Sequence, residues 1–271
     1  MAKTILITGA TDGIGLQTAK RLVVAGHTVL LHGRSAAKLA AIQATLAALP
    51  GAGPVQTFLA DLSRLDEVEA LADAVTAGHP RLDVLINNAG VFMTPDPVSA
   101  DGMDVRFVVN TLAPYSLTQR LLPRFGPGGR IVNLSSAAQA PVDIAALTSG
   151  ATLDPGAAYA QSKLALTMWS QHLAGTLGAD GPVVVAVNPG SLLASKMVRE
   201  GYGIPGKDIG IGADILVRAA LADEFATASG RYFDNDSGRF ADPHRDARDP
   251  LKVAAVVGAI ETCLAVPRPN S

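Results

Sequence analysis

The chain has 271 residues, of which 48% are hydrophobic and 17% charged, a composition that excludes a disordered protein and is ordinary for one α/β domain with a large core. Its 22 Lys and Arg residues against 24 Asp and Glu residues give a net charge of -2, which does not favour a nucleic acid or an anionic membrane surface as partner. We therefore expect a single domain over residues 1–271 that acts on a small molecule.

Short runs of Val, Ile and Leu alternate along the chain with segments in which apolar residues recur at three- and four-residue spacing. The apolar runs predict strands at residues 4–8, 28–32, 55–60, 84–87, 130–134 and 183–187. The periodic segments predict helices at residues 15–25, 36–49, 65–77, 103–125 and 159–177. Because the strands are continuously apolar, helices should cover both of their faces. The alternation predicts an α/β fold with a Rossmann-type, doubly wound parallel sheet of about seven strands.

The last third of the chain has weaker signals. Residues 191–212 contain five glycines without clear periodicity, which predicts a small substrate lid. Residues 234–238 are faintly similar to a calcium loop but lack several of its oxygen ligands, so we interpret them as a turn after the last strand. The five histidines have no ligand spacing with Cys263 or with one another, and no metal site is expected. The tail after Pro250 is uninformative.

No apolar run approaches the roughly 20 residues that cross a bilayer, so no membrane span is expected. Strand-like sequence already begins at Lys3, which leaves no room for an export signal, and the single Cys263 cannot form an internal disulfide. The expected compartment is the cytoplasm.

A glycine-rich turn, Thr8-Gly9-Ala10-Thr11-Asp12-Gly13-Ile14-Gly15, links the first predicted strand to the first predicted helix. Glycines let the backbone approach a pyrophosphate, whose charge then meets the unpaired amides and the positive end of the helix dipole. The spacing Gly-x3-Gly-x-Gly differs from the general dinucleotide fingerprint, so a glycine-rich connector that binds nothing is the alternative. The position between strand and helix, at the switch point of the sheet, favours an anionic cofactor.

Tyr159 and Lys163 are four residues apart in a predicted helix, which places both side chains on one face. A tyrosine that acts as a general acid or base near neutral pH needs a pKa about three pH units below its usual value near 10. A neighbouring ammonium group shifts the tyrosine pKa in that direction. Ser136 follows the strand at 130–134 and lies at the carboxyl edge of the sheet, where open α/β sheets bind ligands. Asn110 lies in an apolar helical segment, where its amide needs a purpose or a backbone partner.

In chain order these motifs resemble those of the short-chain dehydrogenase/reductase family. The matching motifs are the glycine turn, Asp61-Leu62, Asn87-Asn88-Ala89-Gly90, Asn110, Ser136, Tyr159-x3-Lys163 and Asn188-Pro189-Gly190. The resemblance extends to about Phe233. It implies hydride transfer with Tyr159 as acid/base, Lys163 as its electrostatic partner and ribose ligand, and Ser136, rather than Ser135, as the anchor of the substrate oxygen. It also implies that Asn110 kinks its helix and binds a water in a proton relay.

The resemblance implies a set of cofactor contacts as well. Asp61 and Leu62 would hold the adenine, Asn87 with Ala89 and Gly90 would support the ribose, and Pro189-Gly190 would lie against the nicotinamide. The expected cofactor-binding residues are Gly9, Thr11, Asp12, Gly13, Ile14, Gly15, Arg34, Asp61, Leu62, Asn88, Ala89, Gly90, Tyr159, Lys163, Pro189 and Gly190. Relatives assemble through long helices, which implies a homodimer or homotetramer.

The choice of dinucleotide depends on charge at the end of the second predicted strand. A carboxylate there would bind a ribose 2′-hydroxyl, whereas a guanidinium would pair with a 2′-phosphate. Gly33 stands where NAD-preferring relatives have Asp, and Arg34 follows, so NADP(H) is preferred and NAD(H) is possible. Lys38 and Ser35 could assist, while Asp12 is an opposing charge. The alternative is that Arg34 is a solvated loop residue.

Two features depart from the family pattern. The interval between Ser136 and Tyr159 is long and Ala-rich, and resembles the loop of the retinol-dehydrogenase-like and protochlorophyllide-reductase-like branches. Where relatives commonly have a Thr after Pro189-Gly190, this chain has Ala194, with Ser195 or Ser191 as substitutes.

These observations predict an NADP(H)-dependent oxidoreductase that interconverts a carbonyl and an alcohol in a small, moderately apolar substrate. Apolar lid residues favour an oily substrate, although such residues also simply pack lids. These are Leu192, Leu193, Met197 and Val198. The first alternative is a regulator of the same fold that senses NADP(H) without turnover. The second is a sugar-nucleotide epimerase or dehydratase, which expects a different glycine spacing and a longer chain.

Overall fold

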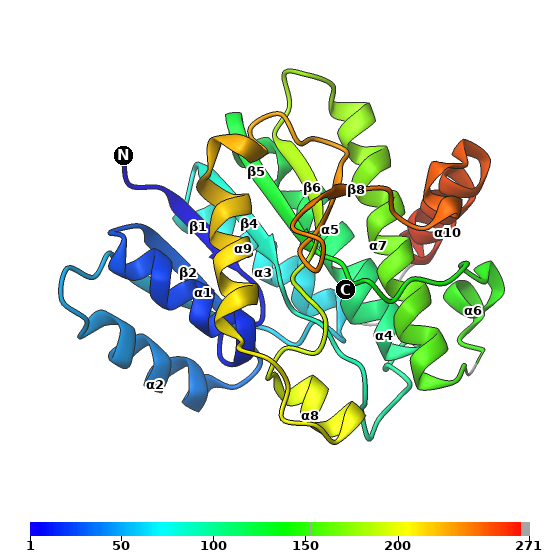
Figure 1. The fold of residues 1–271 in the computed structure, drawn as a ribbon, viewed down its shortest axis with the longest axis horizontal. Helices are drawn as coiled ribbons and strands as arrows, with labels where there is room; N and C mark the ends of the chain where they lie inside the picture. The colour runs from blue at the N-terminus through cyan, green and yellow to red at the C-terminus, as the bar shows by residue number, and fades with distance from the viewer. Residues whose placement is uncertain (152, 267–271) are drawn as a thin grey trace.

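The computed structural model describes residues 1–151 and 153–266. Within these ranges the chain forms an eight-stranded sheet with the strand order β3-β2-β1-β4-β5-β6-β7-β8 (Figure 1). The strands are β1 Thr4–Ile7, β2 Thr28–Gly33, β3 Val55–Leu59, β4 Leu82–Asn87, β5 Phe125–Leu134, β6 Val183–Asn188, β7 Tyr232–Asp234 and β8 Arg239–Ala241. Neighbouring strands pair in parallel except for β7 and β8, which are antiparallel. The predicted doubly wound parallel sheet is confirmed.

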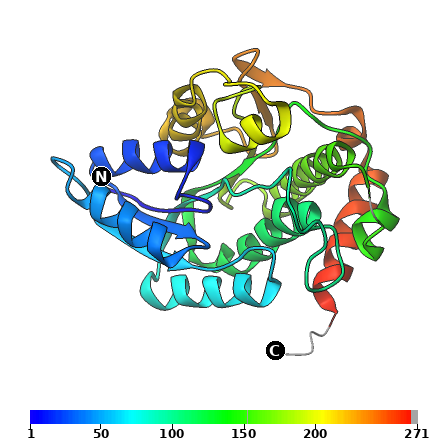
Figure 2. The same ribbon diagram turned by 90° about the horizontal axis from the view of Figure 1, so that it is seen from below.

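Helices cover both faces of this sheet, as its apolar strands require. One face packs against α1 Gly13–Val24, α2 Ala36–Ala47 and α9 Gly210–Leu221. The other packs against α3 Leu65–Gly78, α5 Ala113–Leu121 and α7 Pro155–Leu177, with α10 Pro250–Ala265 outside α7. Figure 2 shows α1 and α9 on one side of the sheet and α3 on the other. Shorter helices complete the fold: α4 Val105–Phe107, α6 Ile144–Ser149, α8 Lys196–Tyr202, a π turn at Val108–Leu112, and 3-10 turns at Leu122–Arg124, Asp223–Phe225 and Arg245–Arg248.

Alternation along each strand divides the core between the two faces. Leu6 and Leu30 belong to one buried cluster, while their chain neighbours Ile5, Ile7 and Val29 belong to the other. This is the two-residue period of a strand, applied to a sheet that is apolar on both sides. The glycine turn follows β1, which pairs with both β2 and β4 and so lies at the switch point of the sheet.

Two expectations about elements require correction. The turn at residues 234–238 does not follow the last strand, because it forms a hairpin that leads into the antiparallel strand β8. The single helix expected at 103–125 is divided into α4, a π turn, α5 and a 3-10 turn, and β5 already begins at Phe125. The lid segment 191–212 contains α8 and the first residues of α9.

Candidate active site

A cavity of about 730 Å³ lies at the carboxyl ends of the parallel strands. It extends from the glycine turn after β1, past the loops that follow β4 and β5, to the loop after β6 and helix α8. Most of the residues that the sequence predicts for catalysis and cofactor contacts line it, whereas Gly15, Asn87 and Asn110 do not. A concave site of this size at a switch point is where open α/β sheets bind nucleotides and small ligands.

The glycine turn is held against the loop after β4. Asn88 Nδ2 donates hydrogen bonds to the carbonyl oxygens of Thr8 at 2.9 Å and Gly9 at 3.0 Å. A Cβ atom at Gly9 would lie 2.9 Å from the Cα atom of Ala89, and one at Gly15 would overlap both Asn88 and the Gly9 carbonyl group. The close approach of the two backbones therefore requires glycine at both positions. Asn88 acts here as a support of the turn.

His32, at the end of β2, is a second support of the turn that the motifs did not indicate. Its side chain is 3% exposed. The Gly9 amide donates to His32 Nδ1 at 3.2 Å, so Nε2 carries the ring hydrogen and donates to the Ala60 carbonyl oxygen at 3.0 Å. Burial lowers the pKa of His32 to about 4. The neutral ring is the form that can accept the Gly9 amide hydrogen.

Asp12 caps the helix that follows the turn. Its carboxylate accepts a hydrogen bond from the Gly13 amide at 2.6 Å, and a negative charge at a helix N-terminus is stabilising. The side chain is exposed at the edge of the cavity. A phosphate bound at the turn would therefore lie near this opposing charge.

Tyr159 and Lys163 lie one helical turn apart on α7, and both line the cavity. The helix begins at Pro155, about one turn before Tyr159. The Asp154 carboxylate caps it by accepting hydrogen bonds from the unpaired backbone amides of its first turn. The Nζ atom of Lys163 lies 5.7 Å from the centre of the Tyr159 ring. The structure thus brings the phenol and the amine together at one wall of the cavity.

Lys163 is 3% exposed, which is unusual for a lysine. Its Nζ atom donates a hydrogen bond of 2.7 Å to the Leu134 carbonyl oxygen at the end of β5. Burial lowers the pKa of Lys163 to about 8, because the charged amine has lost most of its hydration. An anionic group in the cavity would favour the charged form and so counteract this effect.

Ser135 and Ser136 both follow β5 but have different surroundings. Ser135 is buried, and its hydroxyl shares a 2.7 Å hydrogen bond with Thr167 of α7. Ser136 is partly exposed in the cavity, and its Oγ atom accepts a hydrogen bond from the Ala138 amide at 3.1 Å. Of the two, Ser136 is the serine whose hydroxyl can donate to a ligand.

Asn110 is fully buried in the π turn Val108–Leu112. Its Oδ1 atom accepts from the Val91 amide at 2.8 Å, while its Nδ2 atom donates to the Val91 carbonyl oxygen and to Ser162 Oγ, each at 3.0 Å. Turns of this kind are frequent at functional sites. The helix irregularity implied by the family resemblance is present, and protein groups satisfy the amide. The water relay stays a prediction.

The segment after β6 is tied to the β7–β8 hairpin. The amide and the hydroxyl of Ser191 both donate to the Asp236 carboxylate, and Asn235 Nδ2 donates to the Pro189 carbonyl oxygen at 2.9 Å. These bonds hold the backbone that is expected to lie against the nicotinamide. Ser191 and Ser195 both line the cavity: the Ser191 hydroxyl donates to Asp236, whereas the Ser195 hydroxyl accepts the Val198 amide at 3.2 Å as the cap of α8 and keeps its own hydrogen as a donor.

The opposite end of the cavity is formed by residues after β2 and β3. Arg34 is exposed there and lines the cavity. A Cβ atom at Gly33 would lie 2.6 Å from Thr11 Cγ2, so a side chain at this position requires the Thr11 side chain to move. Asp61 lines the same end, and its Oδ1 atom accepts hydrogen bonds from the amide and hydroxyl of Ser63.

The acidic residues of the hairpin have protein partners. Asn188 Nδ2 donates to Asp234 at 2.8 Å and to Asp236 at 2.9 Å. Across residues 1–151 and 153–266, no three His, Cys, Asp or Glu side chains gather as a metal ion would need. Nor does any helix in the described part of the chain combine the length and the apolar character that crossing a membrane requires.

Comparison with known proteins gives one family. A family model described as short chain dehydrogenase matches residues 3–202. Retinol dehydrogenase 12 of Bos taurus is 32% identical over 254 residues, which cover 89% of this chain and 80% of that protein. Polyprenol dehydrogenase of Homo sapiens is 32% identical over 254 residues, which cover 86% of this chain and 77% of that protein.

Solved structures share the fold. An uncharacterized protein from Mycobacterium paratuberculosis superposes with a TM-score of 0.79 at 30% identity, covering 98% of this chain and 95% of that chain. The Pseudomonas aeruginosa RhlG/NADP active-site complex superposes with a TM-score of 0.71 at 27% identity, covering 88% of this chain and 96% of that chain. The second of these structures contains NADP at its active site, according to its description.

Replacing His32 with Asn retains an acceptor for the Gly9 amide and removes the titrating ring. The unfolded chain binds a proton at His32 below about pH 6.5, whereas the folded protein binds it only near pH 4, so acidification through this window favours unfolding. The free energy of unfolding of the wild type, relative to His32→Asn, should fall by up to about 3 kcal/mol across the window. Urea unfolding of both proteins at several pH values measures this difference. Parallel pH curves would contradict the prediction.

Replacing Lys163 with Met removes a buried cation at similar volume. Folded Lys163 loses its proton near pH 8, whereas the unfolded chain keeps it to about pH 10.5, so the stability of the wild type should rise between these values. Relative to Lys163→Met, the gain should be about 3 kcal/mol, measured by urea unfolding. The exposed Lys38, replaced by Met, is the matched control and should leave the pH dependence as it is. A wild-type advantage that does not change with pH would show that the amine is not desolvated.

Proposed function

The chain belongs to the short-chain dehydrogenase family, as its motifs predict, and on this premise we propose that it is an NADP(H)-dependent enzyme that interconverts a carbonyl and an alcohol in a small, moderately apolar molecule. Membership of the family establishes the oxidoreductase class. The observation that carries the finer proposal is a cavity lined by the glycine turn at one end and by Ser136, Tyr159 and Lys163 at the other.

The residues present fit a dinucleotide. Gly9 has no room for a side chain, and Gly9 and Gly13 border the cavity with bare backbone at the N-terminus of α1. Amides at a helix N-terminus, together with the helix dipole, stabilise a phosphate. Lys163 reaches the same cavity with a buried amine, which would hold the nicotinamide ribose.

The preference for NADP(H) is supported by charge and by space. Arg34 places a guanidinium at the end of the cavity where the adenosine would lie, and guanidinium pairs well with phosphate. Gly33 cannot be replaced by the carboxylate of NAD-preferring relatives without displacing Thr11. Both observations favour a cofactor with a 2′-phosphate.

The side chains around the cavity support a tyrosine acid/base mechanism. A bound nicotinamide supplies or accepts the hydride. In the reductive direction the Tyr159 hydroxyl donates its proton to the substrate carbonyl oxygen, which the Ser136 hydroxyl also holds by a hydrogen bond. The Lys163 ammonium stabilises the phenolate that remains, and the Leu134 carbonyl oxygen holds that ammonium in place. In the oxidative direction the Tyr159 phenolate accepts the proton of the alcohol.

The substrate end of the cavity combines an apolar wall with the charged residues Asp96, Lys196 and Glu200. Its lining includes Phe92, Met93, Leu192, Met197 and Val198. Such walls favour apolar substrates, with a few polar groups to orient the reacting atoms. The names of the two relatives denote retinol and polyprenol as their substrates. These names support an apolar alcohol or carbonyl compound as the substrate class.

Replacing Tyr159 with Phe removes the proton donor and little else. Turnover should fall by about 10³-fold, within the range attributed to general acid/base catalysis, while the Kd for NADPH changes by less than about twofold. Oxidation of NADPH with a panel of ketones and aldehydes, followed by absorbance, measures turnover, and fluorescence titration measures binding. Tyr115→Phe is the matched control, because the Tyr115 hydroxyl bonds Glu261 and does not line the cavity. Unchanged turnover in Tyr159→Phe would overturn the mechanism. If the wild-type protein binds NADPH but reduces no carbonyl compound, the alternative of a regulator that senses NADP(H) without turnover is favoured.

Replacing Arg34 with Asp should reverse the cofactor preference. The ratio of kcat/KM for NADPH over NADH should fall by about 100-fold, because charge-assisted bonds to the 2′-phosphate are lost and a repulsive charge is added. Gly33→Asp is the comparison variant, and it should weaken both cofactors because its side chain displaces Thr11. Steady-state kinetics with each cofactor measures the ratios. Equal use of NADPH and NADH by the wild type would contradict the role of Arg34.

A further inference from the structure

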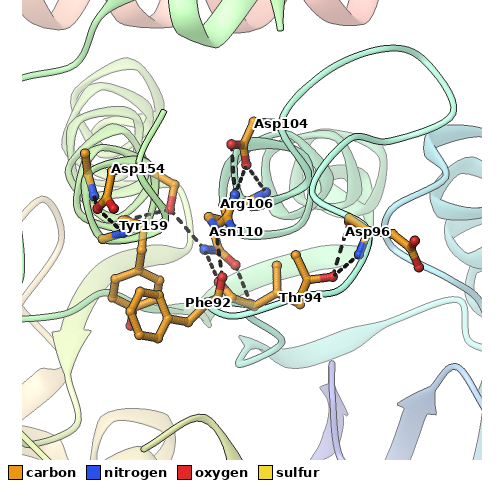
Figure 3. A network of polar contacts seen from close by, with 12 residues as sticks. Phe92, Thr94, Asp96, Asp104, Arg106, Asn110, Asp154 and Tyr159 are labelled. Carbon is orange, nitrogen blue, oxygen red and sulfur yellow. Dashed lines mark hydrogen bonds and ion pairs between the residues drawn. The ribbon is translucent and has the colours of Figure 1, made fainter. Parts of the chain in front are cut away.

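Two side chains of the helical segment after β4 hold consecutive backbone residues of the loop at the substrate end of the cavity. Asn110 bonds both the amide and the carbonyl group of Val91. Arg106, four residues earlier, donates from Nε to the Phe92 carbonyl oxygen at 2.8 Å. Figure 3 shows Arg106 and Asn110 side by side above this loop. The spacing places both side chains on one face of the segment.

Arg106 is held in turn by Asp104, and both side chains are almost fully buried. The Arg106 Nη1 atom lies 2.9 Å and 3.1 Å from the two carboxylate oxygens of Asp104, and the carboxylate also accepts the Arg106 amide at 2.8 Å. The two side chains are 3% and 4% exposed. A buried ion pair loses much hydration and contributes little net stability compared with an apolar pair. What the ion pair provides and an apolar pair would not is a hydrogen-bond donor in a fixed direction. That donor is the Nε atom aimed at Phe92.

The ring of Phe92 contacts both the catalytic tyrosine and the lid. It contacts the Tyr159 ring edge to face, with centroids 5.2 Å apart. The ring also lies against Gly201 of α8, where a Cβ atom would overlap it. The same ring lines the cavity. Phe92 is therefore in contact with the proton donor, the lid helix and the space for substrate.

We infer that Arg106, locked by Asp104, is a positioning residue that fixes Phe92 as the support of α8 and as the wall that selects the substrate. The inference rests on the proposed function for its kinetic part only. When the bond to the Phe92 carbonyl group is absent, the ring moves, α8 loses its support and the substrate pocket loses its shape. Binding of the dinucleotide at the opposite end of the cavity is unaffected.

The test compares two double variants that leave no unpaired buried charge. Asp104→Asn with Arg106→Met keeps the apolar volume but has no donor at the position of Nε. Asp104→Asn with Arg106→Gln keeps an N–H donor at the same number of bonds from the backbone and is the rescue variant. In both, the side-chain amide oxygen introduced at position 104 would still accept the backbone amide of residue 106. A merely structural role of the ion pair would affect the two variants alike.

The readout that does not depend on activity is hydrogen exchange of the α8 amides. In the Met variant, exchange in α8 should rise about tenfold relative to wild type, the factor expected for loss of one charge-assisted hydrogen bond, while exchange in β4 and α7 is unchanged. The Gln variant should return it to within about twofold of wild type. Phe92→Leu, which keeps the polar network and removes the ring, should match the Met variant. Equal α8 exchange in the Met variant and the wild type, failure of Gln to rescue, or no effect of Phe92→Leu would each overturn the inference.

The kinetic readout uses the best apolar ketone of the panel. The Met variant should raise KM about tenfold and change kcat and the Kd for NADPH by less than about threefold, with the Gln variant close to wild type. A loss confined to the Kd for NADPH would overturn the inference. If the wild type reduces no ketone or aldehyde, the proposed function fails, and the exchange experiment alone decides the role of Arg106.

Discussion

A charged amine buried beside a phenol is the constraint on which one end of the cavity depends. Lys163 has exchanged nearly all of its hydration for one carbonyl oxygen at the end of β5, and burial lowers its pKa to about 8. A cation in that position is costly unless an anion or a polarisable group lies nearby. The Tyr159 ring lies 5.7 Å away, and the site gains most from the ammonium when the phenol has lost its proton. The cost of burying Lys163 is thus coupled to the chemistry that the family performs.

The fold supplies this arrangement from elements far apart in the sequence. The parallel sheet brings the carboxyl ends of β1, β4, β5 and β6 to one edge, and α7 carries Tyr159 and Lys163 along that edge. The same edge bears the glycine turn, which His32 and Asn88 hold from the ends of β2 and β4. Helix α1 therefore presents its N-terminus to the cavity with little freedom to move. Support on both sides holds the glycine turn and the Tyr159 side chain in fixed positions around one cavity.

Much of this could be predicted from the sequence, and the failures have physical causes. Continuous apolar runs show buried parallel strands, and the glycine turn shows a close backbone approach. Helix α10 had a usable signal, because Asp249-Pro250 precedes apolar residues at Val253, Val256 and Val257, a cap followed by helical spacing. Strand β8 had no usable signal in the sequence, because the strand is only three residues long and partly exposed. His32 and Arg106 could not be recognised as supports, because each acts on backbone that only the tertiary fold brings near.

The contacts of Asn110 restrict how a proton could pass through this residue. Both hydrogens of its amide nitrogen are engaged, one by the Val91 carbonyl oxygen and one by Ser162, and its Oδ1 atom already accepts the Val91 amide. A carbonyl oxygen has two lone pairs, so the capacity that remains is a single acceptor site. A Cβ atom at Gly90 would lie 3.3 Å from Asn110 Oδ1 and 3.4 Å from Lys163 Nζ. The oxygen and the amine therefore both border the space that a side chain at Gly90 would occupy. A relay through the Asn110 side chain must therefore use its Oδ1 atom as an acceptor, with Lys163 or a water as the donor, and the absence of a side chain at Gly90 leaves that path open.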